Sequence, residues 1–203
     1  MKILFILPLL LFCKISLAQD IPEIPMKSDY VYYAFDHKID NTKKCISFYN
    51  NDLTFLTNMA QKTFSLSTEV TGNPNDIHFS NFSGGILKCT DTISTIAYIV
   101  LPEKLPQTIF GDYKSGFVSV KVDIILIDKN NYKITFKAFT CSLMGKDMNL
   151  TAVDLEEFYS KFKENSKKTK YDIEVFTRID NAVKGIDKLI LESFKKAYQT
   201  DEL

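Results

Sequence analysis

Two runs of alternating apolar and polar residues, joined by a short polar turn, constrain the fold of this chain most strongly. Every second residue is apolar in both runs: Val118, Val120, Val122, Ile124 and Leu126, and then Tyr132, Ile134, Phe136 and Ala138. A period of two places successive side chains on opposite faces of a β-strand. Residues 128–131, Asp-Lys-Asn-Asn, form a turn cluster in which asparagine tolerates a positive φ. We therefore predict a β-hairpin over residues 117–140 with one buried face.

A long amphipathic helix is predicted over residues 172–198. Apolar residues recur there every three or four positions: Ile173, Phe176, Ile179, Val183, Ile186, Ile190, Phe194 and Ala197. This spacing forms one continuous apolar stripe along a helix. Gly185 lies inside the helix and costs about 1 kcal/mol relative to alanine. A stripe of this length must be buried, so we expect the helix to pack on the sheet or on a partner.

The other predicted elements are less regular. They are a strand over residues 30–35, a helix from the Asn51-Asp52 cap to about Phe64, strands over 77–82 and 93–101, a loop over 102–116 and a helix over 152–165. The last of these rests on Thr151 and Asp154, which are spaced as in a capping box. Together the elements predict an α+β fold, an antiparallel β-sheet with helices packed on one face. We divide the chain into a signal peptide at 1–18, a sheet domain at 19–145 and a C-terminal helical segment at 146–203 that packs on the sheet.

The first eighteen residues have the layout of a secretory signal peptide. Lys2 supplies a positive start, residues 3–13 form an apolar run, and Ser16-Leu17-Ala18 is a small-x-small cleavage site before Gln19. The run is too short to span a hydrocarbon core of about 30 Å as a helix. We therefore expect export to the periplasm or the extracellular space, with no transmembrane segment after signal cleavage.

Charge and cysteine content limit the partners and the redox chemistry. Without Lys2 and Lys14, 23 basic residues face 25 acidic residues, a net charge of −2. Such a chain has no overall electrostatic attraction to nucleic acid or to an anionic membrane, so we expect no nucleic-acid partner. Three cysteines remain: Cys45, Cys89 and Cys141. An odd number in an oxidising compartment allows one disulfide with one free thiol, an intermolecular bond, or buried thiols only, and the sequence does not choose between them.

Motifs for catalysis and for metal or cofactor binding are absent from the sequence. The two histidines, His37 and His78, belong to no HExxH pattern, and we interpret His37 as a solvated loop residue and His78 as a surface position on a strand. We therefore expect no enzyme activity, no cofactor and no metal. The lysine-rich stretch 161–170 is the one basic concentration; a solvated helix end or contact with phosphate-bearing envelope polymer or lipid explains it.

The order of the predicted elements resembles a family of uncharacterised exported bacterial domains with a TATA-binding-protein-like (TBP-like) fold. The residues that carry this resemblance are the strand at 30–35, the helix around 53–64, the sequence SGGILKC at 83–89 and the hairpin at 117–140. The resemblance covers about residues 28–142. It implies a fold and an export route but no site residues, and the name of the fold does not imply DNA binding.

These observations lead to one favoured function and two alternatives. We favour a non-catalytic exported binding or interaction domain whose partner is an unknown envelope protein or a small ligand. We place its binding surface at the loop 102–116 and at Ile125 and Ile127, where the end of the strand is apolar on both faces. The first alternative is a carrier of a lipid or other apolar small molecule in a cavity between the sheet and the C-terminal helix. Its lining would come from Phe136, Phe176 and Phe194. The second is a hydrolase with a dispersed active site, which predicts polar groups with perturbed pKa values in a cleft.

Overall fold

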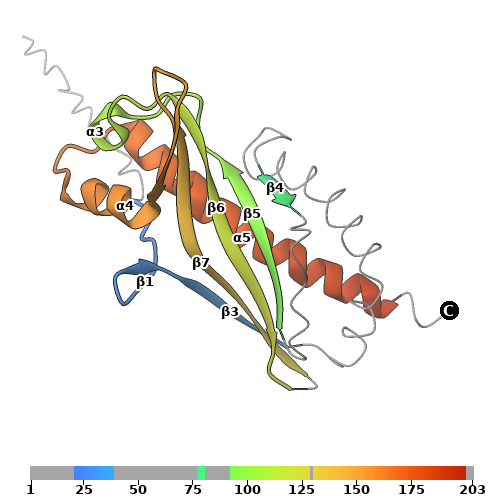
Figure 1. Ribbon diagram of the computed structural model, residues 1–203. Coiled ribbons are helices and arrows are strands. Elements are labelled where there is room, and N and C mark those ends of the chain that lie inside the picture. Colours follow the sequence, from blue (N-terminus) through green and yellow to red (C-terminus); the bar gives the residue numbers. More distant parts are fainter. Residues whose placement is uncertain (1–20, 39–76, 81–91, 129, 200–203) are drawn as a thin grey trace, which may run out of the picture.

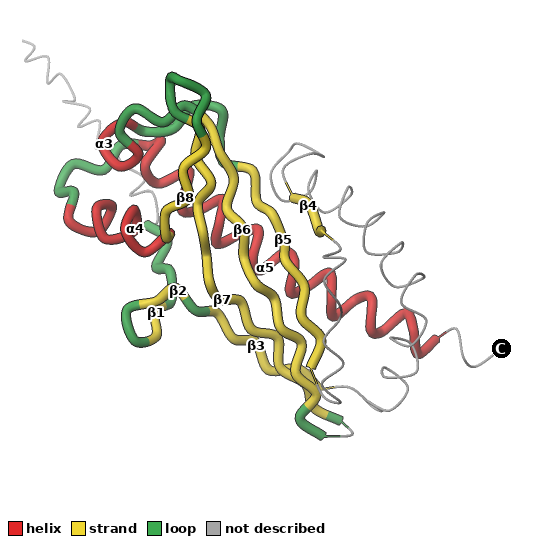
Figure 2. Tube along the Cα trace, in the orientation of Figure 1, coloured by secondary structure: helices red, strands yellow, loops and turns green. Residues whose placement is uncertain are grey.

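A six-stranded antiparallel sheet with one long helix across one of its faces dominates the structure (Figures 1 and 2). The computed structural model describes residues 21–38, 77–80, 92–128 and 130–199 of the 203-residue chain. The strands are β1 (Met26–Lys27), β2 (Tyr30–Val31), β3 (Tyr33–Lys38), β4 (Ile77–Ser80), β5 (Thr92–Val100), β6 (Ser115–Leu126), β7 (Asn131–Met144) and β8 (Leu150–Asp154). The helices are α3 (Gln107–Phe110), α4 (Leu155–Glu164) and α5 (Lys170–Gln199). The α+β class is thereby confirmed.

Several predictions lie outside the described residues. They are the signal peptide at 1–18, the helix ending at about Phe64, the SGGILKC sequence at 83–89, and Cys45 and Cys89. The predicted strand at 30–35 is confirmed in two pieces, β2 and β3, and the strand at 93–101 is confirmed as β5.

The predicted hairpin is confirmed as β6 and β7, but its second strand departs from simple alternation. Ser119 pairs with Thr140 and Lys121 with Lys137, so β7 holds an extra residue between these two pairs. Ala138 adopts a φ of 53° there and is exposed, whereas Phe139 is buried. The prediction that Ala138 lies on the buried face is therefore wrong. The reason is a β-bulge, which shifts the alternation by one residue.

Strand β7 is paired along both edges, and its outer edge is shared by two strands. The sheet order is β3-β7-β6-β5-β4, and β8 also pairs with β7. The first half of β7 pairs with β3, and the second half pairs with β8, from Thr140 opposite Asp154 to Met144 opposite Leu150. The helix predicted over 152–165 therefore begins only at Leu155. The backbone groups of residues 150–154 pair with the open edge of β7 across the short turn at 145–149, and this pairing outweighs the capping pattern.

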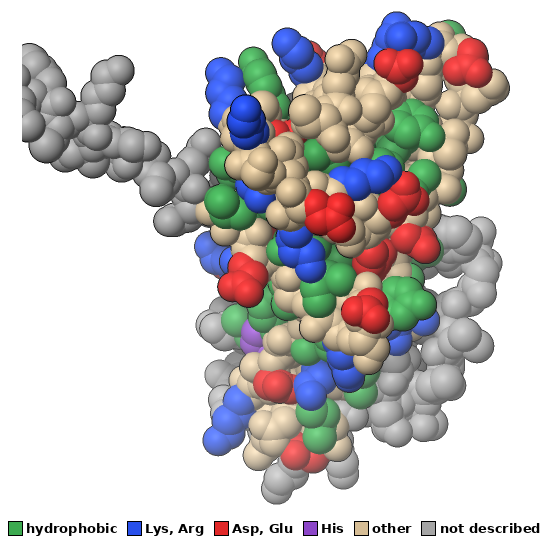
Figure 3. Space-filling view, turned by 90° about the vertical axis from the view of Figure 1, so that its left-hand side faces the viewer, with side chains coloured by type: hydrophobic (Ala, Val, Ile, Leu, Met, Phe, Trp, Pro, Cys, Tyr) green, Lys and Arg blue, Asp and Glu red, His purple; other side chains and the backbone are tan. Residues whose placement is uncertain are grey.

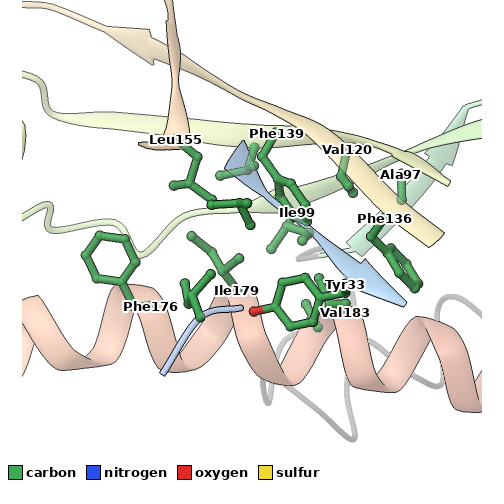
Figure 4. Close-up of a cluster of buried hydrophobic side chains, with 14 of the residues drawn as sticks. Tyr33, Ala97, Ile99, Val120, Phe136, Phe139, Leu155, Phe176, Ile179 and Val183 are labelled. Atoms are coloured by element: carbon green, nitrogen blue, oxygen red, sulfur yellow. The ribbon is translucent and has the colours of Figure 1, made fainter. Parts of the chain in front are cut away.

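Helix α5 buries the predicted apolar stripe against the sheet. Between Val175 and Ile190, its fully buried apolar side chains are Val175, Phe176, Ile179, Ala182, Val183, Ile186 and Ile190. Figure 4 shows Ile179 and Val183 of α5 beneath core residues of the sheet such as Val120 and Ile99. The prediction that this helix packs on the sheet is confirmed.

The start of α5 has a capping box that the sequence analysis missed. The Asp172 N–H donates to Thr169 Oγ1 over 3.2 Å, and the Thr169 N–H donates to Asp172 Oδ2 over 2.5 Å. Thr108 Oγ1 on α3 donates to the other carboxylate oxygen, Oδ1, over 2.7 Å. Asp172 is fully buried and therefore ties α3 to the first turn of α5. The Thr-x-x-Asp spacing that marks this cap is readable in the sequence.

Aromatic rings hold the short helices to α5. Phe162 of α4 lies 4.5 Å from Phe176 between ring centroids, and Tyr159 lies 5.3 Å from the same ring. Phe158 of α4 stacks on Phe110 of α3 at 4.6 Å. These contacts extend the core beyond the sheet to the end of the molecule where α3 and α4 lie (Figure 1). None of the described helices is long and apolar enough to cross a membrane.

Candidate functional site, a polar cleft beside helix α3

A cleft of about 800 Å³ lies at the end of the molecule that α3 and α4 occupy. Three segments line it: residues 107–113, the turn between β7 and β8 with the adjoining part of β8, and the exposed side of α4. Acidic and basic side chains lie interspersed over this side of the molecule (Figure 3). Cavities that hold small ligands have volumes of about 300–1,000 Å³, so the cleft is large enough for one.

Helix α3 forms one wall of the cleft, inside the segment 102–116 that was predicted as an irregular loop. The Pro106 carbonyl accepts the Phe110 N–H over 2.9 Å, and the Gln107 carbonyl accepts the Gly111 N–H over 2.9 Å. Gly111 ends the helix with a φ of 61°, a conformation that glycine adopts without strain. The helix buries Ile109 and Phe110 and leaves Gln107 exposed beside the cleft.

The opposite wall is the turn at residues 145–149. The Gly145 N–H donates to the Asn149 carbonyl over 3.2 Å, and the Asn149 side-chain amide donates to Asp147 Oδ2 over 2.9 Å. The Lys114 N–H donates to the Met144 carbonyl over 3.0 Å, which joins the segment after α3 to the end of β7. The two walls are therefore connected through backbone hydrogen bonds at one end of the cleft.

The third wall is α4, which contributes an aromatic floor and a charged rim. The stacked rings of Phe110 and Phe158 are both buried and form the floor. At the rim, Lys161 Nζ donates to Glu157 Oε1 over 2.8 Å and lies 5.2 Å from the Phe158 ring centroid. Val153 and Thr151 of β8 complete the lining.

Four of the five charged side chains that line the cleft form two ion pairs. Lys146 Nζ lies 3.3 Å from Asp112 Oδ2, between the turn and the segment after α3, and these side chains are 64% and 76% exposed. Lys161 and Glu157 form the second pair, and the Asp147 carboxylate accepts from Asn149. Such a lining offers donors and acceptors of both signs to a ligand, with hydroxyl groups from Thr108, Thr151 and Tyr113. It can bind a hydrophilic ligand through several hydrogen bonds.

The five residues predicted to form a ligand or partner surface do not meet in one place. Phe136 and Phe176 are fully buried members of the core, on β7 and α5. Ile125 is half-buried on β6, and Ile127, just beyond it, is 56% exposed. Phe194 lies on α5, and its side chain is outside the described part. Neither the cleft nor the second hollow described below is lined by any of these five residues. The loop 102–116, named with Ile125 and Ile127, does line the cleft.

His37 is not the solvated loop residue that the sequence suggested. It lies on β3, its side chain is 14% exposed, and its Nε2 lies 2.6 Å from Asp187 Oδ1 on α5. The imidazole also stacks on Tyr132 with 5.1 Å between ring centroids. Burial raises the pKa of Asp187, and the hydrogen bond and charge of His37 partly offset this rise. The pair connects an outer strand to α5, away from the residues of the cleft. His78 lies on β4, and its side chain is outside the described part.

Cys141 is a buried free thiol on β7. Burial, together with the nearby carboxylates of Glu156 and Asp154, raises the pKa of this thiol. A thiol of this kind is unreactive because the thiolate is the nucleophilic form. Cys141 therefore belongs to the core and not to a reactive site.

A second cluster of charges surrounds Asp123 on the sheet face that points away from α5. Ser94 Oγ donates to Asp123 Oδ1 over 2.5 Å, and Lys137 Nζ lies 2.7 Å from Oδ2. Burial raises the pKa of Asp123, but the hydrogen bonds from Lys137 and Ser94 outweigh this effect, and the net pKa is lowered. The cluster neutralises a buried carboxylate, and neither described cavity includes it.

Comparison with known proteins finds two solved structures of low similarity to this chain. No protein-family model and no curated protein matches this chain. A TBP-like protein from Parabacteroides distasonis has 18% sequence identity and a TM-score of 0.47, with 86% of this chain and 97% of that chain covered. A DUF4468 family protein from Bacteroides ovatus has 11% identity and a TM-score of 0.44, with 86% and 90% covered. The predicted resemblance to TBP-like domains is confirmed as a loose one, and neither name states a ligand or an activity.

Proposed function

We propose that this protein is an exported, non-catalytic binding domain that holds a hydrophilic small ligand in the cleft beside α3. One observation carries the proposal: a cleft of about 800 Å³ lined by amide, hydroxyl and oppositely charged side chains above a buried aromatic floor. Small-ligand sites have this size and use a few convergent polar groups to orient the ligand.

The pairing of the cleft carboxylates supports binding over catalysis. Asp112 contacts Lys146, Glu157 contacts Lys161, and Asp147 accepts from Asn149. A carboxylate that acts as a general acid or base must reach the reacting proton with an appropriate pKa. Carboxylates already held by a neighbour are better suited to orienting hydrogen-bond donors of a ligand. Assays for esterase, glycosidase and peptidase activity should therefore give no turnover, and measurable turnover that Glu157→Gln abolishes would contradict this part of the proposal.

The binding part is tested by filling the cleft. Thr151 and Ala152 are adjacent exposed residues of β8, and only Thr151 lines the cleft. Because neighbouring residues of a strand point to opposite faces, Thr151→Trp fills the cleft and Ala152→Trp is the matched control. The probes are monosaccharides, short oligosaccharides and dipeptides, measured by saturation-transfer NMR. We expect at least one probe to bind the natural protein and Ala152→Trp but not Thr151→Trp. Binding by no probe, or equal binding by all three proteins, would overturn the proposal.

Export is proposed on the basis of residues 1–18. The test is to fractionate cells that express the full chain and to measure the intact mass of the product. We expect a periplasmic or secreted protein that begins at Gln19. A cytoplasmic protein that retains residues 1–18 would contradict this localisation.

A further inference from the structure

A second hollow, of about 580 Å³, lies beside the cleft and shares part of its lining. The two have five residues in common: Gln107, Thr108, Asp112, Tyr113 and Lys146. The rest of the second lining comes from residues 103–106, Lys114, Thr169 and Tyr171. A ligand that occupies the cleft can therefore extend along α3 into this hollow.

The second hollow differs from the cleft in its charge. Three lysines line it, Lys104, Lys114 and Lys146, together with two acids, Glu103 and Asp112. Lys146 already pairs with Asp112. Within the described ranges, no ion pair within 4.0 Å joins Lys104 or Lys114 to a carboxylate. Two ammonium groups thus remain available to a ligand. Both lysines that line the cleft, Lys146 and Lys161, are already in ion pairs.

Local contacts orient these lysines. Lys104 Nζ lies 5.2 Å from the centre of the Tyr171 ring, and Lys170 Nζ lies 5.0 Å from the same ring. A cation over an aromatic face is held there by attraction to the ring electrons. The backbone of Lys114 is fixed by its hydrogen bond to the Met144 carbonyl. The ammonium of Lys104 therefore begins from a held position and loses less freedom on binding an anion than a freely moving side chain would, whereas for Lys114 only the backbone is fixed.

The buried acid beside the hollow, Asp172, is held by hydrogen bonds from the protein itself. Asp172 is fully buried, and its two carboxylate oxygens accept from the Thr108 hydroxyl and the Thr169 N–H. The same bonds satisfy the capping box of α5, so the positive character of the hollow comes from the lysines and not from open helix N–H groups.

We infer that the hollow beside α3 binds an anionic group, a phosphate or a carboxylate, through Lys104 and Lys114, and that the ligand of the neighbouring cleft carries this group. The inference rests on the proposed function for its second part, since it names the class of ligand that the cleft would hold. Lysine suits both anions because its ammonium is a point charge with three donors.

The experiment uses three sugars, glucose, glucose 6-phosphate and glucuronate, and inorganic phosphate as a fourth probe without a sugar. Binding to the full mature protein is measured by NMR titration in buffer of low ionic strength. The double variant Lys104→Gln/Lys114→Gln removes both ammonium groups, and Lys38→Gln on β3 removes one exposed charge outside both cavities. We expect at least one anionic probe to bind more tightly than glucose. The double variant should weaken that probe roughly fivefold, at a few tenths to 1 kcal/mol per exposed ammonium, and Lys38→Gln should not. Added salt should weaken it as well.

The phosphate and carboxylate probes distinguish which anion binds, and the two variants distinguish the anion site from the cleft. Preference for glucose 6-phosphate assigns a phosphate ligand, and preference for glucuronate assigns a carboxylate. If Thr151→Trp removes sugar binding but the lysine variant changes nothing, the anion inference is wrong and the cleft stands. If the lysine variant weakens phosphate but Thr151→Trp leaves every probe unaffected, the anion site stands and the cleft proposal fails. If each of the four probes binds the double variant as tightly as it binds the natural protein, the inference is overturned.

Discussion

The sheet–α5 interface and the α3 end of the molecule are built from opposite kinds of side chain. Phe136 of β7 and Phe176 of α5 are fully buried, and the interface around them consists mainly of aliphatic and aromatic groups, with two polar contacts from β3 to Asp180 and Asp187 of α5. At the α3 end, the surface is hollowed and lined by amides, hydroxyls and charges. The contrast separates the side chains that stabilise the fold from those of the proposed binding site. Helix α5 belongs to both regions, because its apolar stripe packs on the sheet and its first turn borders the second hollow.

The largest effect is expected from Phe176→Ala in the first region. The ring is fully buried against Tyr159 and Phe162, so its loss leaves a cavity and should lower the free energy of unfolding by about 3–5 kcal/mol. Urea denaturation followed by circular dichroism measures the change. Phe176→Leu is the control, because a smaller cavity should cost much less. A loss below about 1 kcal/mol for the alanine variant would mean that the two regions do not differ as described.

A smaller but still large effect is expected from Gly116→Ala on β6. A Cβ at Gly116 would clash with the Ser142 carbonyl oxygen and would lie 2.7 Å from Leu143 Cδ2 and 3.2 Å from Leu143 Cα, all on β7. Because backbone atoms must move, we expect a loss of about 1–3 kcal/mol. Thermal unfolding of this variant and of the neighbouring Ser115→Ala should show a clear difference. Equal midpoints would show that the strands tolerate the extra methyl group.

Asp123→Asn tests a buried charge that lies in neither cavity. The folded-state pKa of Asp123 is below the ordinary value of 3.8, so its charge contributes stability above about pH 4 that is lost as the pH falls through the folded pKa. We expect the variant to be less stable by about 1–3 kcal/mol at pH 7. The difference should shrink steadily as the pH is lowered below 4. Asp36→Asn, an exposed residue paired with Lys133, is the control. A difference that does not change with pH would contradict the assignment of the effect to the charge.

The smallest effect on stability is expected at the cleft itself. Asp112 and Lys146 are both more than half exposed, so Asp112→Asn should change the free energy of unfolding by less than about 0.5 kcal/mol. The same variant should change the affinity of any probe that the cleft binds. A loss of stability as large as that of Gly116→Ala would remove the distinction between the two regions.

The elements with local periodicity could be predicted from sequence, and those that depend on pairing with a neighbouring strand could not. The hairpin and the helix at 172–198 were predictable because a period of two or of about 3.6 is visible within one segment. Strand β8 was not, because its residues become a strand only beside the free edge of β7. The bulge at Ala138 was missed since nothing in the alternation of Tyr132, Ile134 and Phe136 announces it.

The candidate site was predictable in one part. The loop 102–116 was singled out, because prolines and glycines between strands indicate a surface segment. Its partners, the turn at 145–149 and the rim of α4, join it only through the tertiary fold. The position of His37 against Asp187 was missed for the same reason, since 150 positions separate them in sequence.

The pairing of β7 along both edges has a consequence for how the chain acquires its structure. Tyr33 of β3 pairs with Phe136, and Leu150 of β8 pairs with Met144, so the earliest and the latest strands of the six-stranded sheet both depend on β7. While the chain is synthesised from its N-terminus, β3 therefore has no partner in this sheet until residues 131–144 have been made. Because pairing between distant parts of a chain forms slowly, the six-stranded sheet is completed late.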